Sequence, residues 1–119
     1  MVDDEVSVRT MLGRLLRLAD YKVAAFGSGE DFIASLTKRR PDCLILDVHM
    51  PGLSGLEVQS RIGVAHGDIP AVFITASDDI ALDRRVREAG GIRLLRKPFS
   101  SDELLEAVGD ALQRPPRGV

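Results

Sequence analysis

The sequence predicts an α/β fold in which helices cover both faces of a parallel sheet. Short apolar segments alternate with longer amphipathic segments five times along the 119 residues, a pattern typical of α/β domains. Residues 43–46 and 71–74 are continuously apolar, as expected of strands that are covered on both faces. Polar residues directly follow these apolar segments. In such a fold, ligands bind at the carboxyl ends of the strands.

The amphipathic segments carry the spacing and the start signals of helices. Apolar residues at helical spacing predict a helix over residues 6–19. A serine followed three residues later by an acidic residue is a helix start signal, and it begins further helices at Ser28, Ser54 and Ser100. Another helix is predicted over residues 78–89, before a Gly–Gly pair that ends it.

Five strands are predicted between these helices. In chain order they are a stub at residues 1–2, then residues 21–26, 43–46, 71–75 and 94–95. The length fits one domain, which we assign to residues 1–113. Residues 114–119 include two prolines and are predicted to be a tail or the start of a linker.

The composition excludes several classes of protein. Apolar residues make up 45% and charged residues 29% of the chain, which are values of a globular protein rather than a disordered one. A net charge of −2 argues against a surface built for nucleic acid, and no apolar segment approaches the roughly 20 residues that cross a bilayer. The single cysteine excludes an internal disulfide and fits a cytoplasmic setting.

Charged and hydroxyl side chains gather at the predicted carboxyl ends of four strands: Asp3 and Asp4, Asp47, Thr75 and Lys97. Two carboxylates about 4 Å apart repel each other by roughly 4 kcal/mol at an effective dielectric of 20. A hard divalent cation such as Mg²⁺ removes this repulsion. A hydroxyl and an ammonium group beside it can hold phosphoryl oxygens. We therefore predict a carboxylate that accepts a phosphoryl group with the help of a metal.

Each of these residues also has a purely structural interpretation, as a helix cap, a strand residue or a surface charge. Their co-occurrence at four strand ends is what favours a functional site.

The motifs around these residues resemble the receiver domain of bacterial two-component response regulators, most closely receivers of the FixJ type. The resemblance extends from residue 2 to about residue 113. It is carried by Val2-Asp3-Asp4-Glu5, PDCLILDVHMPGLSG at residues 41–55, Ile74-Thr75-Ala76, Ala89-Gly90-Gly91 and Lys97-Pro98-Phe99. It implies a doubly wound, flavodoxin-like fold with five parallel strands in the order 2-1-3-4-5, here with a truncated first strand. Full-length FixJ-type proteins carry a helix-turn-helix output domain.

The resemblance also implies a role for each acidic residue. Asp47 corresponds to the phosphoacceptor. Asp3 and Asp4 correspond to the acidic pair that binds Mg²⁺, with Asp4 as the direct ligand and Asp3 acting through water. The backbone carbonyl of His49 corresponds to a further metal ligand.

Other matching residues correspond to the switch. Thr75 corresponds to the hydroxyl that moves toward the phosphoryl group, and Lys97 to the lysine that pairs with a phosphoryl oxygen. The Lys97–Pro98 peptide is expected to be cis. Leu94 stands at a switch position that is usually aromatic in the family. Ser77, like His49, corresponds to a variable position beside the phosphoryl group, although a loop or cap residue fits both places.

The implied partner is a sensor histidine kinase, and the implied output surface comprises residues 78–89, 94–95 and the last helix. That surface is also the expected homodimer face, in which arginines pair with acidic residues: Arg84, Arg85, Arg87, Arg93 and Arg96 with Asp102, Glu103, Glu106 and Asp110. An ordinary solvated surface of mixed charge is the alternative. Direct binding to nucleic acid or to a membrane is not expected. The domain is expected to be a cytoplasmic phosphoacceptor, not an enzyme, that promotes its own phosphorylation and slow dephosphorylation.

Two other functions compete with this interpretation. A phosphohydrolase with an aspartyl nucleophile needs a second acid two residues after the nucleophile, where this chain has His49. A phosphate-independent interaction domain is favoured by Leu94 and by the short first strand, but the complete set of acidic residues, threonine and lysine disfavours it.

The first strand is unusually short for an interior strand. Only Met1 and Val2 precede Asp3, and each buried hydrogen bond left unmade on the neighbouring strands costs about 1–3 kcal/mol. We therefore expect a truncated chain whose natural form begins several residues earlier. The alternatives are a gap filled by water or by a partner's chain, and a sheet that closes up without this strand.

Overall fold

The computed structural model describes residues 1–67 and 69–113. Three parallel strands form its sheet: β1 (Leu44–Asp47), β2 (Ala71–Thr75) and β3 (Arg93–Arg96), in the order β1-β2-β3. The strands β1 and β2 are buried along their whole length, as their continuously apolar sequences predict. The predicted tail at residues 114–119 lies outside the described residues.

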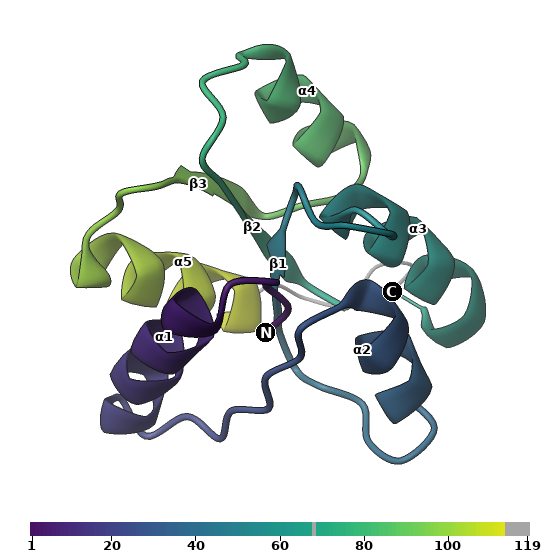
Figure 1. Cartoon of the computed structure of the whole chain (residues 1–119), viewed down its shortest axis with the longest axis horizontal. Coiled ribbons are helices and arrows are strands. Elements are labelled where there is room, and N and C mark those ends of the chain that lie inside the picture. Colours follow the sequence, from purple (N-terminus) through teal and green to yellow (C-terminus); the bar gives the residue numbers. More distant parts are fainter. Residues whose placement is uncertain (68, 114–119) are drawn as a thin grey trace.

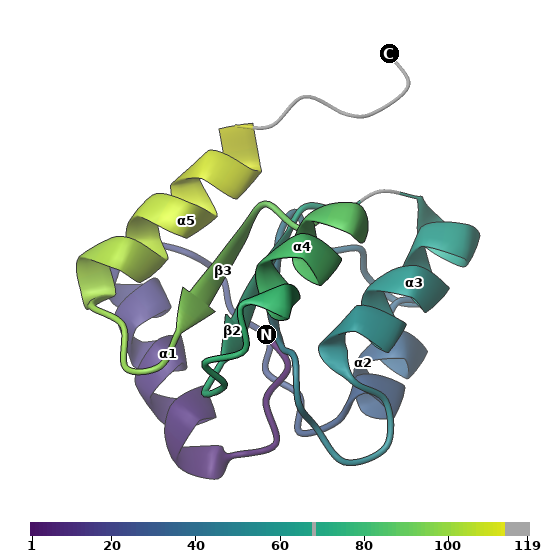
Figure 2. The same cartoon turned by 90° about the horizontal axis from the view of Figure 1, so that it is seen from above.

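Helices cover both faces of this sheet (Figures 1 and 2). In chain order they are α1 (Val6–Leu18), α2 (Gly29–Ser35), α3 (Gly55–His66), α4 (Ala81–Glu88) and α5 (Ser101–Gln113). Apolar residues of α1 and α5 pack against Ile45, Val72 and Ile74 on one face. Apolar residues of α2, α3 and α4 pack against Leu44, Leu46 and Phe73 on the other. None of these helices is long and apolar enough to cross a membrane.

Of the five strands predicted, the first of them truncated, the structure has three as regular strands. Residues 1–3 and 21–26 form no regular strand, and Val2 makes single parallel bridges to Phe26 on one side and Leu46 of β1 on the other. The segment over residues 1–3 is too short to form a continuous series of backbone hydrogen bonds with residues 21–26. Those residues therefore have a strand-like partner only near Phe26. The segments containing Phe26 and Val2 nevertheless extend the parallel arrangement beyond β1.

Backbone hydrogen bonds hold the N-terminal segment between its neighbours. Val2 N–H donates to the carbonyl of Ile45 at 2.8 Å, and the carbonyl of Val2 accepts from Asp47 N–H at 2.9 Å. On the other side, Phe26 N–H donates to the carbonyl of Met1 at 2.9 Å. These bonds fix the residues just before Asp3 beside the end of β1.

The predicted start signals cap their helices. The Ser28 hydroxyl accepts from Asp31 N–H at the start of α2. At the start of α3, the Ser54 hydroxyl accepts from Glu57 N–H while the Glu57 carboxylate accepts from Ser54 N–H. Both are local bonds that satisfy free amide groups of the first turn, which is why sequence spacing predicts them.

The helix predicted over residues 78–89 begins later, at Ala81. The Ser77 hydroxyl accepts from Asp79 N–H at 3.1 Å, and the Asp79 carboxylate accepts from Ala81 N–H at 3.0 Å. These side chains hold residues 77–79 in turns that compete with helix formation. A loop of five residues, 76–80, therefore connects β2 to α4.

Candidate functional site

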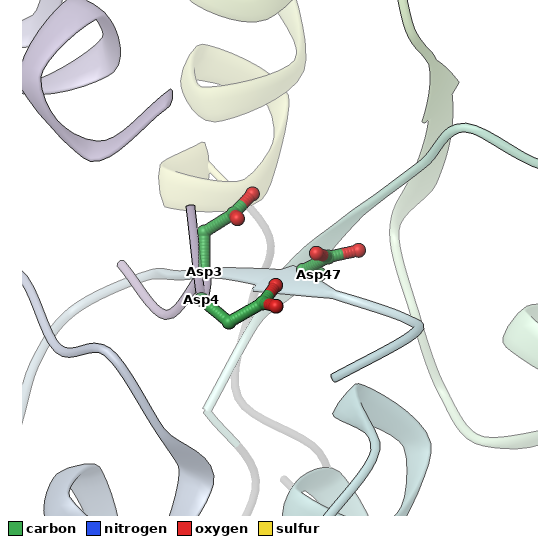
Figure 3. Close-up of side chains that lie close together, drawn as sticks. All are labelled: Asp3, Asp4 and Asp47. Atoms are coloured by element: carbon green, nitrogen blue, oxygen red, sulfur yellow. The ribbon is translucent and has the colours of Figure 1, made fainter. Parts of the chain in front are cut away.

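Three carboxylates meet at the carboxyl end of β1 (Figure 3). Each of Asp3, Asp4 and Asp47 offers one oxygen, and these oxygens lie within 4.8 Å of one another. Asp47 is the last residue of β1. The bridge between Val2 and Leu46 places Asp3 and Asp4, which directly follow Val2, beside Asp47. Asp3 is 0% and Asp47 4% exposed, whereas Asp4 is exposed. The structure thus brings together the acids that the sequence places at two strand ends.

Lys97 lies over the two buried carboxylates. Its Nζ is 3.2 Å from Asp3 Oδ2, 3.6 Å from Glu5 Oε1 and 3.8 Å from Asp47 Oδ2. Burial alone would lower the pKa of Lys97, but the negative charges of Asp47 and Asp3 outweigh it and raise that pKa. The ammonium group is therefore a permanent positive charge at this edge of the sheet.

Asp47 is held in an environment that disfavours its ionised form. Burial, and then repulsion by Asp3, raise its pKa from 3.8 to about 6, against the attraction of Lys97 and the backbone hydrogen bond from His49. That bond runs from His49 N–H to Asp47 Oδ1 at 3.3 Å. One ammonium group thus leaves the negative charge of this site only partly balanced.

The donor set fits a hard divalent cation. It consists of carboxylate oxygens, two of the three acids are buried, and positive charge is needed where they meet. Oxygen ligands of this kind suit Mg²⁺, which is bound by few carboxylates and keeps several waters.

Two local features hold the acids in place. Asp3 Oδ1 accepts from Glu5 N–H at 2.9 Å, and the carbonyl of Asp3 accepts from Arg9 Nη1 at 2.7 Å. At the other acid, Gly55 begins α3 directly against β1, and a Cβ at this position would collide with the Asp47 carbonyl oxygen. Only glycine allows this close approach without displacing the end of β1.

Thr75 ends β2 one residue beyond Ile74, the register partner of Asp47. It is fully buried, and its Oγ1 accepts from Ser77 N–H at 3.0 Å. Its hydroxyl hydrogen is not used in that bond. Lys97 N–H donates to the Thr75 carbonyl at 2.7 Å, so the backbones at the predicted threonine and lysine are joined directly.

The remaining predicted residues lie in the loops after β1 and β3 and within β3 itself. The Lys97–Pro98 peptide is cis, as predicted. His49 is exposed, and its backbone carbonyl stays a predicted metal ligand. Leu94 is partly buried against the core on the side of α4, and its role in a switch stays a prediction.

Several charges predicted for a dimer face are paired within the chain. Arg93 Nη2 lies 2.9 Å from Glu106 Oε1 and 2.8 Å from Asp110 Oδ2. Arg84 pairs with the neighbouring Glu88 on α4 at 3.4 Å. Such exposed pairs are individually weak, and the dimer face stays a prediction.

Sequence reasoning missed the roles of three charged residues. Glu5 contacts Lys97, Arg9 holds the carbonyl of Asp3, and Arg96 binds the loop between β2 and α4. Glu5 and Arg96 are sequence neighbours of predicted site residues, Asp4 and Lys97, and that adjacency was the available signal. Arg9 gave none, because its contact depends on where α1 packs.

Comparisons with known proteins agree with this geometry. The response regulator receiver domain family matches residues 1–109. Nodulation protein W of Bradyrhizobium diazoefficiens is 40% identical over 114 residues, which cover 96% of this chain and 50% of that protein. The response regulator StyR is similar in structure, with a TM-score of 0.82 and 43% identity over 94% of this chain and 57% of that one. FixJ-N has a TM-score of 0.87 and 31% identity, over 96% of this chain and 91% of that one.

The chain spans about half the length of the curated relatives it matches, 50% of nodulation protein W and 53% of the regulator TmoT of Ectopseudomonas mendocina. The similarity therefore concerns the domain described here. Because the family match covers nearly the whole of that domain and its acidic residues meet at one site, the chain belongs to the response regulator receiver domains of two-component signalling.

Proposed function

We propose that this domain is a phosphorylation-dependent switch in which Asp47 accepts a phosphoryl group from a histidine kinase. The observation that carries the proposal is the position of Asp47. It is a nearly buried carboxylate within reach of the two other acids and of the Lys97 ammonium group. This arrangement brings together a nucleophile and the positive charge that a transferred phosphoryl group requires.

In the proposed reaction, a carboxylate oxygen of Asp47 attacks the phosphorus atom in line with the bond to the donor. A new O–P bond forms, the bond from phosphorus to the donor nitrogen breaks, and its electron pair stays on that nitrogen. Asp47 must be ionised to attack. Because its pKa is about 6, most of it is ionised near neutral pH.

Mg²⁺ would be held by the carboxylates of Asp4 and Asp47 and by the His49 carbonyl, with Asp3 acting through water. When bound, it supplies positive charge that balances the phosphoryl oxygens. Side chains of the protein bind the other phosphoryl oxygens. Lys97 pairs with a phosphoryl oxygen, which draws its ammonium group away from Asp3, and Thr75 donates its hydroxyl hydrogen to another phosphoryl oxygen.

The product is an acyl phosphate, which water removes slowly. The domain thus promotes its own phosphorylation and dephosphorylation without turning over another substrate. We propose that the new contacts bias the face formed by α4, β3 and α5 toward a second packing, which controls a homodimer or an output domain. A cytoplasmic location stays a prediction.

The experiment that tests this proposal is phosphorylation by acetyl phosphate and Mg²⁺, followed by intact-protein mass spectrometry. The wild type should gain the mass of one phosphoryl group, and Asp47→Asn should gain none. Asp42→Asn is a matched control, because Asp42 is an exposed acid just before β1. An equal adduct on Asp47→Asn refutes the assignment of the acceptor. An unmodified wild type favours a phosphate-independent interaction domain.

A further inference from the structure

The guanidinium group of Arg96 binds both the loop between β2 and α4 and the first turn of α4. It is the last residue of β3, directly before Lys97. Its Nε donates to the Ser77 carbonyl at 3.2 Å, and its Nη2 donates to the Asp79 carbonyl at 2.9 Å. Nη1 and Nη2 also contact the two carboxylate oxygens of Asp83, at 3.3 and 3.0 Å.

These contacts join three separate parts of the fold. Arg96 belongs to β3, Ser77 and Asp79 to the loop over residues 76–80, and Asp83 to the first turn of α4. The pairing with Asp83 is bidentate, the geometry that makes arginine–carboxylate pairs strong and directional. A lysine at this position could not reproduce the planar fork.

The same loop is bonded to the phosphoacceptor site. Ser77 N–H donates to Thr75 Oγ1 at 3.0 Å, while the Ser77 carbonyl accepts from Arg96. Lys97 N–H, one residue after Arg96, donates to the Thr75 carbonyl. Ser77 therefore contacts the predicted switch hydroxyl with one side of its backbone and Arg96 with the other.

Arg96 is suited to this link by its place in the strand. Residues two apart in a strand lie on the same face, so Arg96 shares a face with Leu94, which packs against the core on the side of α4. Leu94 has no polar atom that could bond to the loop. The side chain of Arg96 is long enough for its guanidinium nitrogens to donate hydrogen bonds to both the loop and α4.

We propose that Arg96 is a positioning residue that couples the Thr75 hydroxyl to the first turn of α4 through residues 77–79. This inference rests on the proposed function, since the signal to be coupled is phosphorylation of Asp47. With the Arg96 contacts in place, a displacement of Thr75 and Ser77 is passed on to Asp83. Without them, the first turn of α4 keeps its local bonds to Asp79 and Ile80 but loses its side-chain link to β3, and its response to phosphorylation is lost.

The test is residue-resolved amide hydrogen exchange, measured with and without acetyl phosphate and Mg²⁺. The variants are Arg96→Gln and, as a milder change, Asp83→Asn, which leaves the bonds from Arg96 to the loop carbonyls available. Arg84→Gln is the matched control, because Arg84 is an arginine of α4 whose exposed side chain pairs with Glu88 on the same helix.

Before phosphorylation, Arg96→Gln should speed exchange of the Ser77 amide about tenfold or more, whereas Arg84→Gln should leave it unchanged. After phosphorylation of the wild type, exchange at Ser77 and in the first turn of α4 should change together. In Arg96→Gln and Asp83→Asn, the change at Ser77 should remain and the change in α4 should be lost.

The inference is overturned if α4 of Arg96→Gln still responds as in the wild type. It is also overturned if the Ser77 amide is unaffected, or if exchange rises equally throughout β2 and β3, which would indicate general destabilisation. Mass spectrometry on the same samples separates the two proposals. In the wild type, an adduct without coupled exchange refutes the role of Arg96 alone, and the absence of an adduct refutes the phosphoacceptor proposal.

Discussion

Lys97 is closer to Asp3 than to Asp47, with its Nζ 3.2 Å from an oxygen of the first and 3.8 Å from an oxygen of the second. The ammonium group thus lies between two buried carboxylates and is not dedicated to the proposed acceptor. A phosphoryl group on Asp47 would add oxygens that compete with Asp3 for this ammonium group. The contact of the Lys97 ammonium group with Asp3 should therefore change when Asp47 is phosphorylated, and that change can be measured.

Lys97→Ala should separate metal binding from signalling. Removing a positive charge beside the acids should leave the affinity for Mg²⁺ unchanged or raise it, as titration calorimetry would show. The phosphorylated variant should lose its conformational response, because no ammonium group pairs with the phosphoryl oxygen. Markedly weaker Mg²⁺ binding by Lys97→Ala, or an intact response after phosphorylation, would contradict this assignment.

Asp4→Asn should weaken Mg²⁺ binding by about tenfold or more, which corresponds to about 1.4 kcal/mol. Asp4 is the exposed member of the acidic cluster, so this substitution should change the fold little. Asp102→Asn is the control, because Asp102 is an exposed acid in the first turn of α5. Equal losses of affinity in the two variants would place the metal site elsewhere.

The stability of the metal-free protein should depend on pH through Asp47. Its pKa is about 6 in the folded protein against an ordinary value of 3.8, so the folded state binds this proton more tightly than the unfolded state does. The contribution of Asp47 to the free energy of unfolding therefore falls as pH rises from about 4 to about 6, and then levels off. A shift of about 2 pKa units corresponds to about 3 kcal/mol as an upper limit.

Urea unfolding of the wild type and Asp47→Asn in the presence of a chelator measures this effect. The variant should become progressively more stable than the wild type across that pH range, and Mg²⁺ should reduce the difference by stabilising the wild type. Asp42→Asn is the control, because Asp42 is an exposed acid outside the site. A stability difference between wild type and Asp47→Asn that does not change with pH would mean that Asp47 has an ordinary pKa.

Two glycines of α3 should respond oppositely to alanine. At Gly55 a Cβ would collide with the Asp47 carbonyl, so Gly55→Ala should cost about 1–3 kcal/mol of stability and weaken Mg²⁺ binding by displacing the end of β1. At Gly63 a Cβ would meet no atom within 4 Å. Gly63→Ala should therefore stabilise the helix by about 0.5–1 kcal/mol. Thermal unfolding of both variants, with Mg²⁺ titration, tests the pair; matching effects would contradict the close contact at Gly55.

Features that depend on neighbouring residues were predictable from the sequence. The caps at Ser28 and Ser54 are contacts between residues three apart in the sequence. The burial of β1 and β2 is predicted by their continuously apolar sequences. The meeting of Asp3 and Asp47 followed from fold class, because parallel strands present their carboxyl ends at one edge. The cis peptide before Pro98 followed from the family resemblance.

Features that depend on distant contacts were not predictable in the same way. Residues 21–26 look like a strand, but a ladder needs a partner of equal length, and only Phe26 is bridged to Val2. Charges along α5 and β3 looked available for a partner, whereas Arg93 is bound to Glu106 and Asp110. Charge in a sequence shows neither which partner a side chain finds nor whether that partner lies in the same molecule.

The pairing of both arginines of β3 has a consequence for association. The sheet that the structure describes ends at β3, and an unpaired strand edge invites another strand to add to it. Here each end of that short edge carries an arginine, Arg93 fastened to α5 and Arg96 fastened to the loop and α4. Charged residues on an edge strand disfavour the addition of another strand. Edge-to-edge polymerisation is thereby opposed.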